Sequence, residues 1–374
     1  MKTKPIGLYV HIPFCLKKCN YCDFCSFAGI SEEERAGYVD ALAREIRGYK
    51  REDKLSVDTI FFGGGTPSLL TALEFDIIVK AIRESFDVLP DTEFSIEANP
   101  KTLTREKMLA FVSHGVNRIS IGLQTIHENE RLSLGRVHNF DDFKASYALA
   151  RECGISSIGV DLMYGIPEQS VESFKETLLA VLALKPQHIS CYGLIIEEGT
   201  PFYNKSSQLA LPSEDQECDM YEMALELLSG SGFSHYEISN YALRGFESRH
   251  NLKYWRLQEY VGVGLAAHSF FNGVRSYNTD NMSVYLSGNP KEYSVKDNIS
   301  TDELAYDFIM LGLRLREGIS LAEYKERFGY DFLDGRRDIL NKYISSGYMS
   351  LNGDCLSLTD KGLYVSNTIL TDLL

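Results

Sequence analysis

The chain has 374 residues, of which 44% are hydrophobic and 24% charged, a composition typical of a globular protein and unlike that of a disordered or fibrous one. Its net charge of −14 disfavours a nucleic-acid-binding surface, because nucleic-acid phosphates attract cationic proteins, so we expect no nucleic-acid partner. No apolar run is long enough to span a bilayer and no charged-then-apolar leader precedes Tyr9, so we expect a cytoplasmic protein whose eight cysteines are reduced.

The first predicted strand, at 7–11, leads into a loop with three closely spaced cysteines. Cys15, Cys19 and Cys22 have the spacing CxxxCxxC. An iron–sulfur cluster takes one thiolate per iron, so three cysteines leave one iron of a four-iron cluster open to a ligand. A zinc knuckle or chance clustering is the alternative, but zinc motifs usually contain two cysteine pairs, and the sequence has no second pair. A fourth thiol, Cys25, follows closely; it could support the cluster or form a disulfide on oxidation, but we interpret it as a neutral passenger.

Short apolar runs alternate with segments of helical period over the first two hundred residues. After 7–11, strands are predicted at 59–62, 93–98, 118–124, 157–163 and 188–194. Helices are predicted at 31–49, 71–86, 104–114, 141–153 and 170–184, and the first opens with a Ser-x-x-Glu capping box. This alternation predicts an α/β fold of parallel βα units, and six units are too few for a complete eight-fold barrel.

Polar or glycine-rich residues follow every predicted strand, at the carboxyl ends where barrel enzymes place their chemistry. The six ends are the cysteine loop, the run GGGTPS at 63–68, Glu97, Gln124, Asp161 and Tyr192-Gly193. Three glycines let backbone groups approach a ligand closely, although a tight turn also explains glycine there. Chance could supply some of these residues but not a complete ring.

The charged and aromatic residues of this ring suit a polar organic ligand. Buried carboxylates such as Glu97 and Asp161 need donors, and ribose hydroxyls or an ammonium group would serve. Arg136 suits a carboxylate, with a surface ion pair as the alternative. Tyr9 and Tyr21 flank the cysteine loop, where they could cover a cluster or stack on an adenine.

The rest of the chain divides at a polar stretch near 204–208. We expect three domains, at 1–203, 204–298 and 299–374. The second contains a predicted helix at 212–230 and the run HNLKYW at 250–255. The third is predicted to be an α+β, winged-helix-like module with a hairpin at 348–358 turning at Asn352-Gly353. The acidic charge favours a packing or lid role for this module over DNA binding.

With these motifs assembled, the chain resembles the radical S-adenosylmethionine (SAM) proteins, and among them the oxygen-independent coproporphyrinogen III oxidase-like family. The motifs cover nearly the whole chain and are HIPFCxxxCxxCDF, FFGGGTPS, EANP, GVNRISIGLQ, LGRVH, DLMYGIPEQ, YEISNYA and HNLKYW. The resemblance implies a partial (β/α)6 barrel, with a [4Fe–4S] cluster on Cys15, Cys19 and Cys22 and SAM on the open iron. In that family the GGGTP run meets the amino group of SAM. The SAM-binding residues implied here are Tyr9, Tyr21, Gly64, Gly65, Thr66, Glu97, Gln124, Arg136, Asp161 and Gly193.

Two features separate the branches of this family. Oxidases of the family usually carry an N-terminal extension and a fourth cysteine two residues after the third, whereas here the loop begins at Cys15 and Phe24 occupies the other position. HNLKYW matches the HNxxYW pattern of the HemW branch, whose members are described as heme chaperones. This implies heme binding by His250, Asn251, Tyr254 and Trp255.

The chemistry of the HNxxYW segment agrees with that implication. His250 could be an axial ligand of the heme iron, Tyr254 and Trp255 could pack on the macrocycle, and Lys253 could meet a propionate. A structural histidine is the alternative for His250. His268 is a second candidate ligand, or it lines the mouth of the barrel.

We therefore predict a chaperone that binds heme and passes it to an acceptor protein, which could be a membrane-bound heme protein. It carries a [4Fe–4S] cluster and SAM and has no coproporphyrinogen oxidase activity. The alternatives are the anaerobic decarboxylation of coproporphyrinogen III and a radical SAM reaction on another tetrapyrrole. If SAM is cleaved, an electron donor such as flavodoxin or ferredoxin is required.

Overall fold

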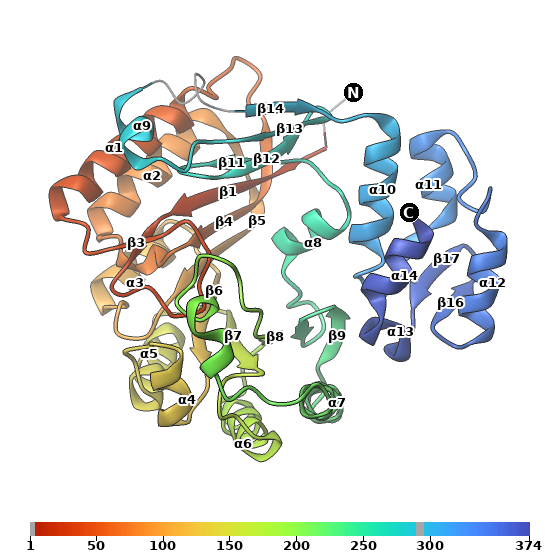
Figure 1. Ribbon diagram of the computed structural model, residues 1–374. Helices are drawn as coiled ribbons and strands as arrows, with labels where there is room; N and C mark the ends of the chain where they lie inside the picture. Colours follow the sequence, from red (N-terminus) through yellow and green to blue (C-terminus); the bar gives the residue numbers. More distant parts are fainter. Residues whose placement is uncertain (1–3, 289–294) are drawn as a thin grey trace.

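A computed structural model describes residues 4–288 and 295–374, and its centre is one strongly curved sheet (Figure 1). Six strands that correspond to the predicted ones follow one another as parallel neighbours: β1 (Ile6–Ile12), β4 (Ser56–Gly64), β5 (Asp87–Ala98), β6 (Arg118–Gln124), β7 (Ser157–Tyr164) and β8 (His188–Gly193). All six predicted strands are confirmed. They read as apolar runs because helices cover the outer face of a parallel sheet, and Leu8, Val10 and Ile12 of β1 are fully buried.

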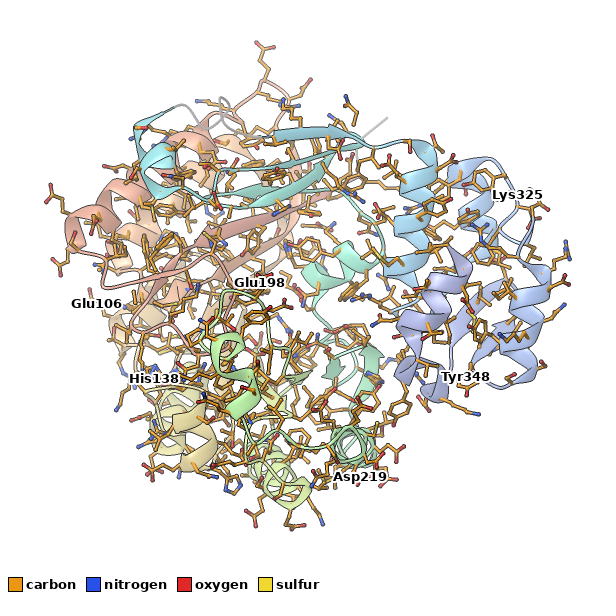
Figure 2. The ribbon with its side chains drawn as sticks, viewed as in Figure 1. Glu106, His138, Glu198, Asp219, Lys325 and Tyr348 are labelled. Carbon is orange, nitrogen blue, oxygen red and sulfur yellow. The ribbon has the colours of Figure 1, made fainter. Side chains whose placement is uncertain are left out.

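Each βα unit returns through a helix on the outside of the sheet (Figure 1). These helices are α1 (Glu32–Arg47), α2 (Ala72–Ser85), α3 (Arg105–Ser113), α4 (Glu128–Ser133), α5 (Phe140–Glu152) and α6 (Val171–Leu182). The capping box expected at the start of α1 is present, since Ser31 and Glu34 bond each other's backbone N–H groups. Charged side chains such as Glu106 on α3 point outward into solvent (Figure 2).

Further strands extend the sheet at both edges. Beyond β1 lie β11 (Tyr260–Val263), which is parallel to it, and then β12 (His268–Phe271), β13 (Val274–Tyr277) and β14 (Val295–Asn298). Beyond β8 lie β10 (Asn240–Ala242) and β9 (Ser234–Glu237), which follow α7 (Glu214–Gly230). Because the strands β9 to β14 extend both edges of one sheet, we infer that this part of the chain extends the barrel.

The last part of the chain has its own hydrophobic core, which includes Tyr324, Phe332 and Leu356. Its elements are α10 (Thr301–Gly312), β15 (Ile319–Ser320), α11 (Leu321–Phe328), α12 (Arg337–Ser345), β16 (Met349–Asn352), β17 (Cys355–Leu358), α13 (Asp360–Tyr364) and α14 (Ser366–Leu373). The expected hairpin is present, but its turn lies one residue later than predicted. Asn352 pairs with Cys355, so the loop residues are Gly353, at φ 62°, and Asp354.

One short helix, α8 (Arg249–Trp255), lies between the sheet and the C-terminal helices (Figure 1). It carries the HNLKYW segment. The carboxylate of Glu93 on β5 accepts hydrogen bonds from the backbone N–H groups of Arg249 and His250, and therefore fixes the first turn of α8 against the sheet. In the described ranges, 4–288 and 295–374, we find no helix with the length and apolar character needed to cross a bilayer.

Candidate functional site

The cysteine loop leaves β1 and is closed by a small parallel pairing of β2 (Phe14–Cys15) with β3 (Phe27–Ala28). Cys15, Cys19 and Cys22 are half-buried and line one cavity of about 430 Å³, which opens at the carboxyl ends of the parallel strands. We call it the barrel cavity. Among the described residues, no three ligating side chains converge on a point where a single metal ion could bind. A four-iron cluster makes a different demand, since each thiolate binds its own iron, and three thiols facing one cavity fit it.

Cys25 does not join the other three thiols. It lines a neighbouring cavity, and its backbone carbonyl accepts a hydrogen bond of 2.8 Å from His11 Nε2. Burial raises the pKa of the Cys25 thiol, which keeps it protonated at neutral pH. This position agrees with its interpretation as a residue that does not hold the cluster.

Most of the predicted SAM-binding residues line the barrel cavity. They are Tyr21, Gly64, Gly65, Glu97, Gln124, Arg136, Asp161 and Gly193. Two others lie beside it. The Thr66 hydroxyl is 3.7 Å from Cys15 Sγ, and Tyr9 lines the cavity that contains Cys25.

Arg136 places an uncompensated positive charge on the wall of the barrel cavity. Its Nη2 donates to Asn99 Oδ1 at 2.8 Å and to the Gly122 carbonyl at 2.6 Å, and its Nη1 lies 3.9 Å from Cys19 Sγ. The residue is 8% exposed, and its partners in the described part of the chain include no carboxylate. A buried cation without an acidic partner suits a ligand carboxylate close to the cysteines.

Gln124 supplies a second group that lacks a partner. Its Oε1 is buried and accepts no hydrogen bond from the described residues, and its backbone is held at φ 72°. Such a conformation costs about 1–3 kcal/mol for a non-glycine residue. An orphaned acceptor at a strained position on the cavity wall suits a ligand with a donor group.

The glycine run is required by the packing of the chain itself. Gly64 has φ 112°, and a Cβ there would lie 2.6 Å from the His11 ring. A Cβ on Gly65 would lie 2.6 Å from the Phe14 carbonyl oxygen. The turn therefore needs glycine whether or not a ligand binds, and the run leaves backbone groups facing the cavity.

The two carboxylates of the ring differ in their environment. Asp161 Oδ1 accepts hydrogen bonds from Ser120 and Ser190 at 2.9 and 2.8 Å. Among the residues that the structure describes, Glu97 has one hydrogen-bond donor, the Gly64 N–H at 3.2 Å. Burial, and secondly the charge of Asp161, raise the pKa of Glu97 to about 8. Without a ligand, Glu97 is therefore mostly protonated at neutral pH.

The pKa of Glu97 makes SAM binding depend on pH. If Glu97 receives the ammonium group of SAM, it must release its proton, so affinity should rise with pH by up to about tenfold per unit below pH ~7.5. The rise should end near that pH, because the α-amino group of SAM itself loses its proton near pH ~8 and with it the charge that Glu97 would bind. Equilibrium dialysis with labelled SAM measures the slope, and Glu97→Gln should remove it. An equal slope in Glu97→Gln would contradict this role.

Sequence reasoning missed several residues on the cavity wall. Arg118, Ser120 and Gly122 line it beside the predicted Gln124, because alternate residues of β6 face the same side of the sheet. The two-residue period of this strand was the signal that could have found Arg118 and Ser120. Asn99, which orients Arg136, lies in the EANP motif but was not singled out.

The HNLKYW residues do not share one site. The His250 ring is fully buried, its Nδ1 lies 2.9 Å from Thr59 Oγ1 and its Nε2 lies 2.8 Å from the Tyr254 hydroxyl. The ring also stacks on Phe61 at 5.3 Å, and burial lowers the pKa of His250 to about 3, so it is neutral. Both ring nitrogens are thus occupied by the chain itself.

The other members of the segment point in different directions. Asn251 lines the barrel cavity, Tyr254 lines the cavity that contains Cys25, and Trp255 packs beneath the Arg314 guanidinium at 5.6 Å. Lys253, expected to meet a propionate, instead pairs with Asp58 at 2.8 Å and donates to the Pro5 carbonyl. That expectation is corrected, because the lysine is buried and already neutralised.

Comparison with known proteins gives two family matches and many full-length relatives. Residues 9–181 match the radical SAM superfamily, and residues 299–365 match the HemN C-terminal domain. The chain is 33% identical to the heme chaperone HemW of Lactococcus lactis, covering 100% of this chain and 98% of the relative. It is 35% identical to the heme chaperones HemW of Bacillus subtilis and Escherichia coli, covering 96% and 99% of this chain and 97% and 98% of those relatives.

A solved structure supports the fold. The coproporphyrinogen III oxidase HemN of Escherichia coli, a radical SAM enzyme, superposes with a TM-score of 0.86 at 22% identity. The match covers 100% of this chain and 91% of that enzyme. At this identity the likeness establishes the architecture and not the reaction.

Proposed function

This chain belongs to the HemW family of radical SAM proteins, and from that membership we propose that it is a heme chaperone, which binds heme and passes it to an acceptor protein. The observation that carries the proposal is the similarity to curated heme chaperones over essentially the whole chain. The shared architecture with an oxidase does not decide between the two activities, because one fold can host different functions.

The radical SAM domain brings a [4Fe–4S] cluster and SAM. We assign the cluster to Cys15, Cys19 and Cys22, which face the barrel cavity together. Arg136 then meets the SAM carboxylate, Glu97 the ammonium group and Asp161 the ribose. When bound, the cluster supplies the electron that can cleave SAM.

The partners beyond heme follow from this chemistry. The acceptor is a protein that takes up intact heme. If SAM is cleaved, the cluster needs an electron donor such as flavodoxin or ferredoxin.

Heme ligation by His250 remains a prediction, and it would require the His250 ring to leave its present contacts. The bond between His250 Nε2 and the Tyr254 hydroxyl must break, and the ring must leave its place on Phe61. The rest of the HNxxYW segment contributes to heme binding in this proposal in different ways. Asn251 lines the barrel cavity, Tyr254 lines the cavity that contains Cys25, and Trp255 supports the packing of α8.

The fate of the tetrapyrrole separates a chaperone from an enzyme. Cluster-loaded protein is incubated anaerobically with SAM, a reductant and either heme or coproporphyrinogen III, and the tetrapyrroles are then extracted and quantified. We expect heme to be recovered unchanged and no protoporphyrinogen to form. Protoporphyrinogen formation would support the oxidase alternative, and consumption of heme would support a heme-modifying enzyme. Either result would contradict the chaperone proposal.

A further inference from the structure

A second cavity adjoins the barrel cavity and shares Phe24, Gly64 and Glu97 with it. It measures about 590 Å³ and is bordered by β1, the cysteine loop, α8, β12, β13 and α10. Its walls are largely aromatic and aliphatic, with Tyr254, Tyr260, Phe270 and Leu311 among them. Such walls suit a large planar apolar ligand, because aromatic side chains pack well on a flat ring system.

Two imidazoles line this second cavity, and only one has free nitrogen atoms. His11 Nδ1 lies 2.9 Å from the Tyr9 hydroxyl, and its Nε2 lies 2.8 Å from the Cys25 carbonyl oxygen. The His268 side chain is exposed, and neither ring nitrogen has a hydrogen-bond partner among residues 4–288 and 295–374. Its ring is held by stacking on Tyr277, with 5.2 Å between centroids.

The protonation of His268 also suits iron binding. Although the side chain is exposed, its partial desolvation against the cavity wall lowers its pKa, which favours the neutral ring with an available nitrogen lone pair. His250, by contrast, does not line the second cavity, and both its nitrogens are engaged. The imidazole that can reach a ligand without any rearrangement is that of His268.

A cation lies in the same cavity. Arg275 forms an ion pair with Asp307 of α10, and its side chain is 46% exposed. A guanidinium can bind a carboxylate in a bidentate manner, so an incoming propionate can share or replace Asp307. The cavity thus combines apolar walls, an available imidazole and a cation.

We propose that heme binds in the second cavity, with the imidazole of His268 as an iron ligand and Arg275 on a propionate. This inference rests on the proposed function, since it names the place where the chaperoned heme lies. In this inference His268 replaces His250 as the iron ligand, and His250 acts as a positioning residue, because its hydrogen bond holds Tyr254 in the cavity wall. The HNxxYW segment shapes the site, and His268 supplies the ligand.

The test is an anaerobic heme titration of the full cluster-loaded chain, followed by Soret absorbance and by EPR of the ferric form. We expect His268→Ala to change the Soret and EPR spectra and to weaken binding by about tenfold or more, and added imidazole to restore the spectra. His250→Ala should keep the wild-type spectra and lose only a few-fold in affinity. His114→Ala, which removes a histidine from the outer helical layer, is the matched control.

The charge of the ligand provides an independent readout. Arg275→Gln should lower the affinity for heme but not for heme dimethyl ester, which lacks free carboxylates. Wild-type spectra and affinity in His268→Ala would overturn the inference, as would spectra lost in His250→Ala but kept in His268→Ala. In both cases the chaperone function would stand. A wild-type chain without saturable heme binding would overturn the proposed function and the inference together.

Discussion

Cys19→Ser is expected to prevent assembly of the iron–sulfur cluster, whereas Cys25→Ser is expected to leave it intact. Cys19 faces the barrel cavity together with Cys15 and Cys22, and three thiolates are already one fewer than a four-iron cluster usually has. Removing one more should lower bound iron and sulfide by more than ~10-fold. Cys25 lines the second cavity, and its removal deprives the cluster of nothing.

Iron and sulfide analysis after anaerobic reconstitution measures the effect, with circular dichroism as a check of folding. The pair is well matched, because both residues are half-buried cysteines of the same loop. Loss of the cluster in Cys25→Ser, or its retention in Cys19→Ser, would contradict the assignment.

Arg136→Met is expected to weaken SAM binding by about 100-fold, or about 3 kcal/mol, which is typical when one partner of a buried charge pair is removed. The guanidinium is buried beside Cys19 and meets no carboxylate in the parts of the chain that the structure describes. In the substituted protein the SAM carboxylate would enter a low-dielectric cavity without a counterion.

Equilibrium dialysis with labelled SAM measures the loss. Arg136→Lys keeps the charge but loses the paired donors to Asn99 and Gly122. Its affinity for SAM should therefore lie between that of the wild type and that of Arg136→Met. Arg105→Met removes an exposed arginine of α3 and serves as the control. An affinity for SAM that is unchanged in Arg136→Met would refute the assignment.

The sequence predicts the parallel strands well because helices cover the outer face of each strand, which therefore carries closely spaced apolar residues, as Ile119, Ile121 and Leu123 do in β6. It misses α4, which has only six residues, and the strands β11 to β13, which have four each. Elements this short have too few positions to establish a period. The hairpin turn was misplaced by one residue for another reason. Asn-Gly predicts that a hairpin is present, but the pairing of Asn352 with Cys355 across the strands sets where it turns.

The sequence predicts correctly that Glu97, Gln124 and Asp161 lie together on the wall of one cavity, because each stands at the carboxyl end of a parallel strand; their binding roles stay predictions. The accessibility of a side chain to a ligand was not predictable where residues distant in the sequence form hydrogen bonds with it. His250 looks like an accessible ligand in the sequence, yet Thr59, 191 residues earlier, and Tyr254 occupy its two nitrogens. The availability of His268 likewise depends on the strand pairing that sets it against Tyr277.

The most direct test of the chaperone function is the stoichiometry of heme binding to the wild-type, cluster-loaded chain under anaerobic conditions. We predict saturation at one heme per chain, with the heme recoverable intact after SAM and a reductant are added. Unsaturable binding, of the kind that any apolar surface gives, would contradict the account, and so would loss of the heme.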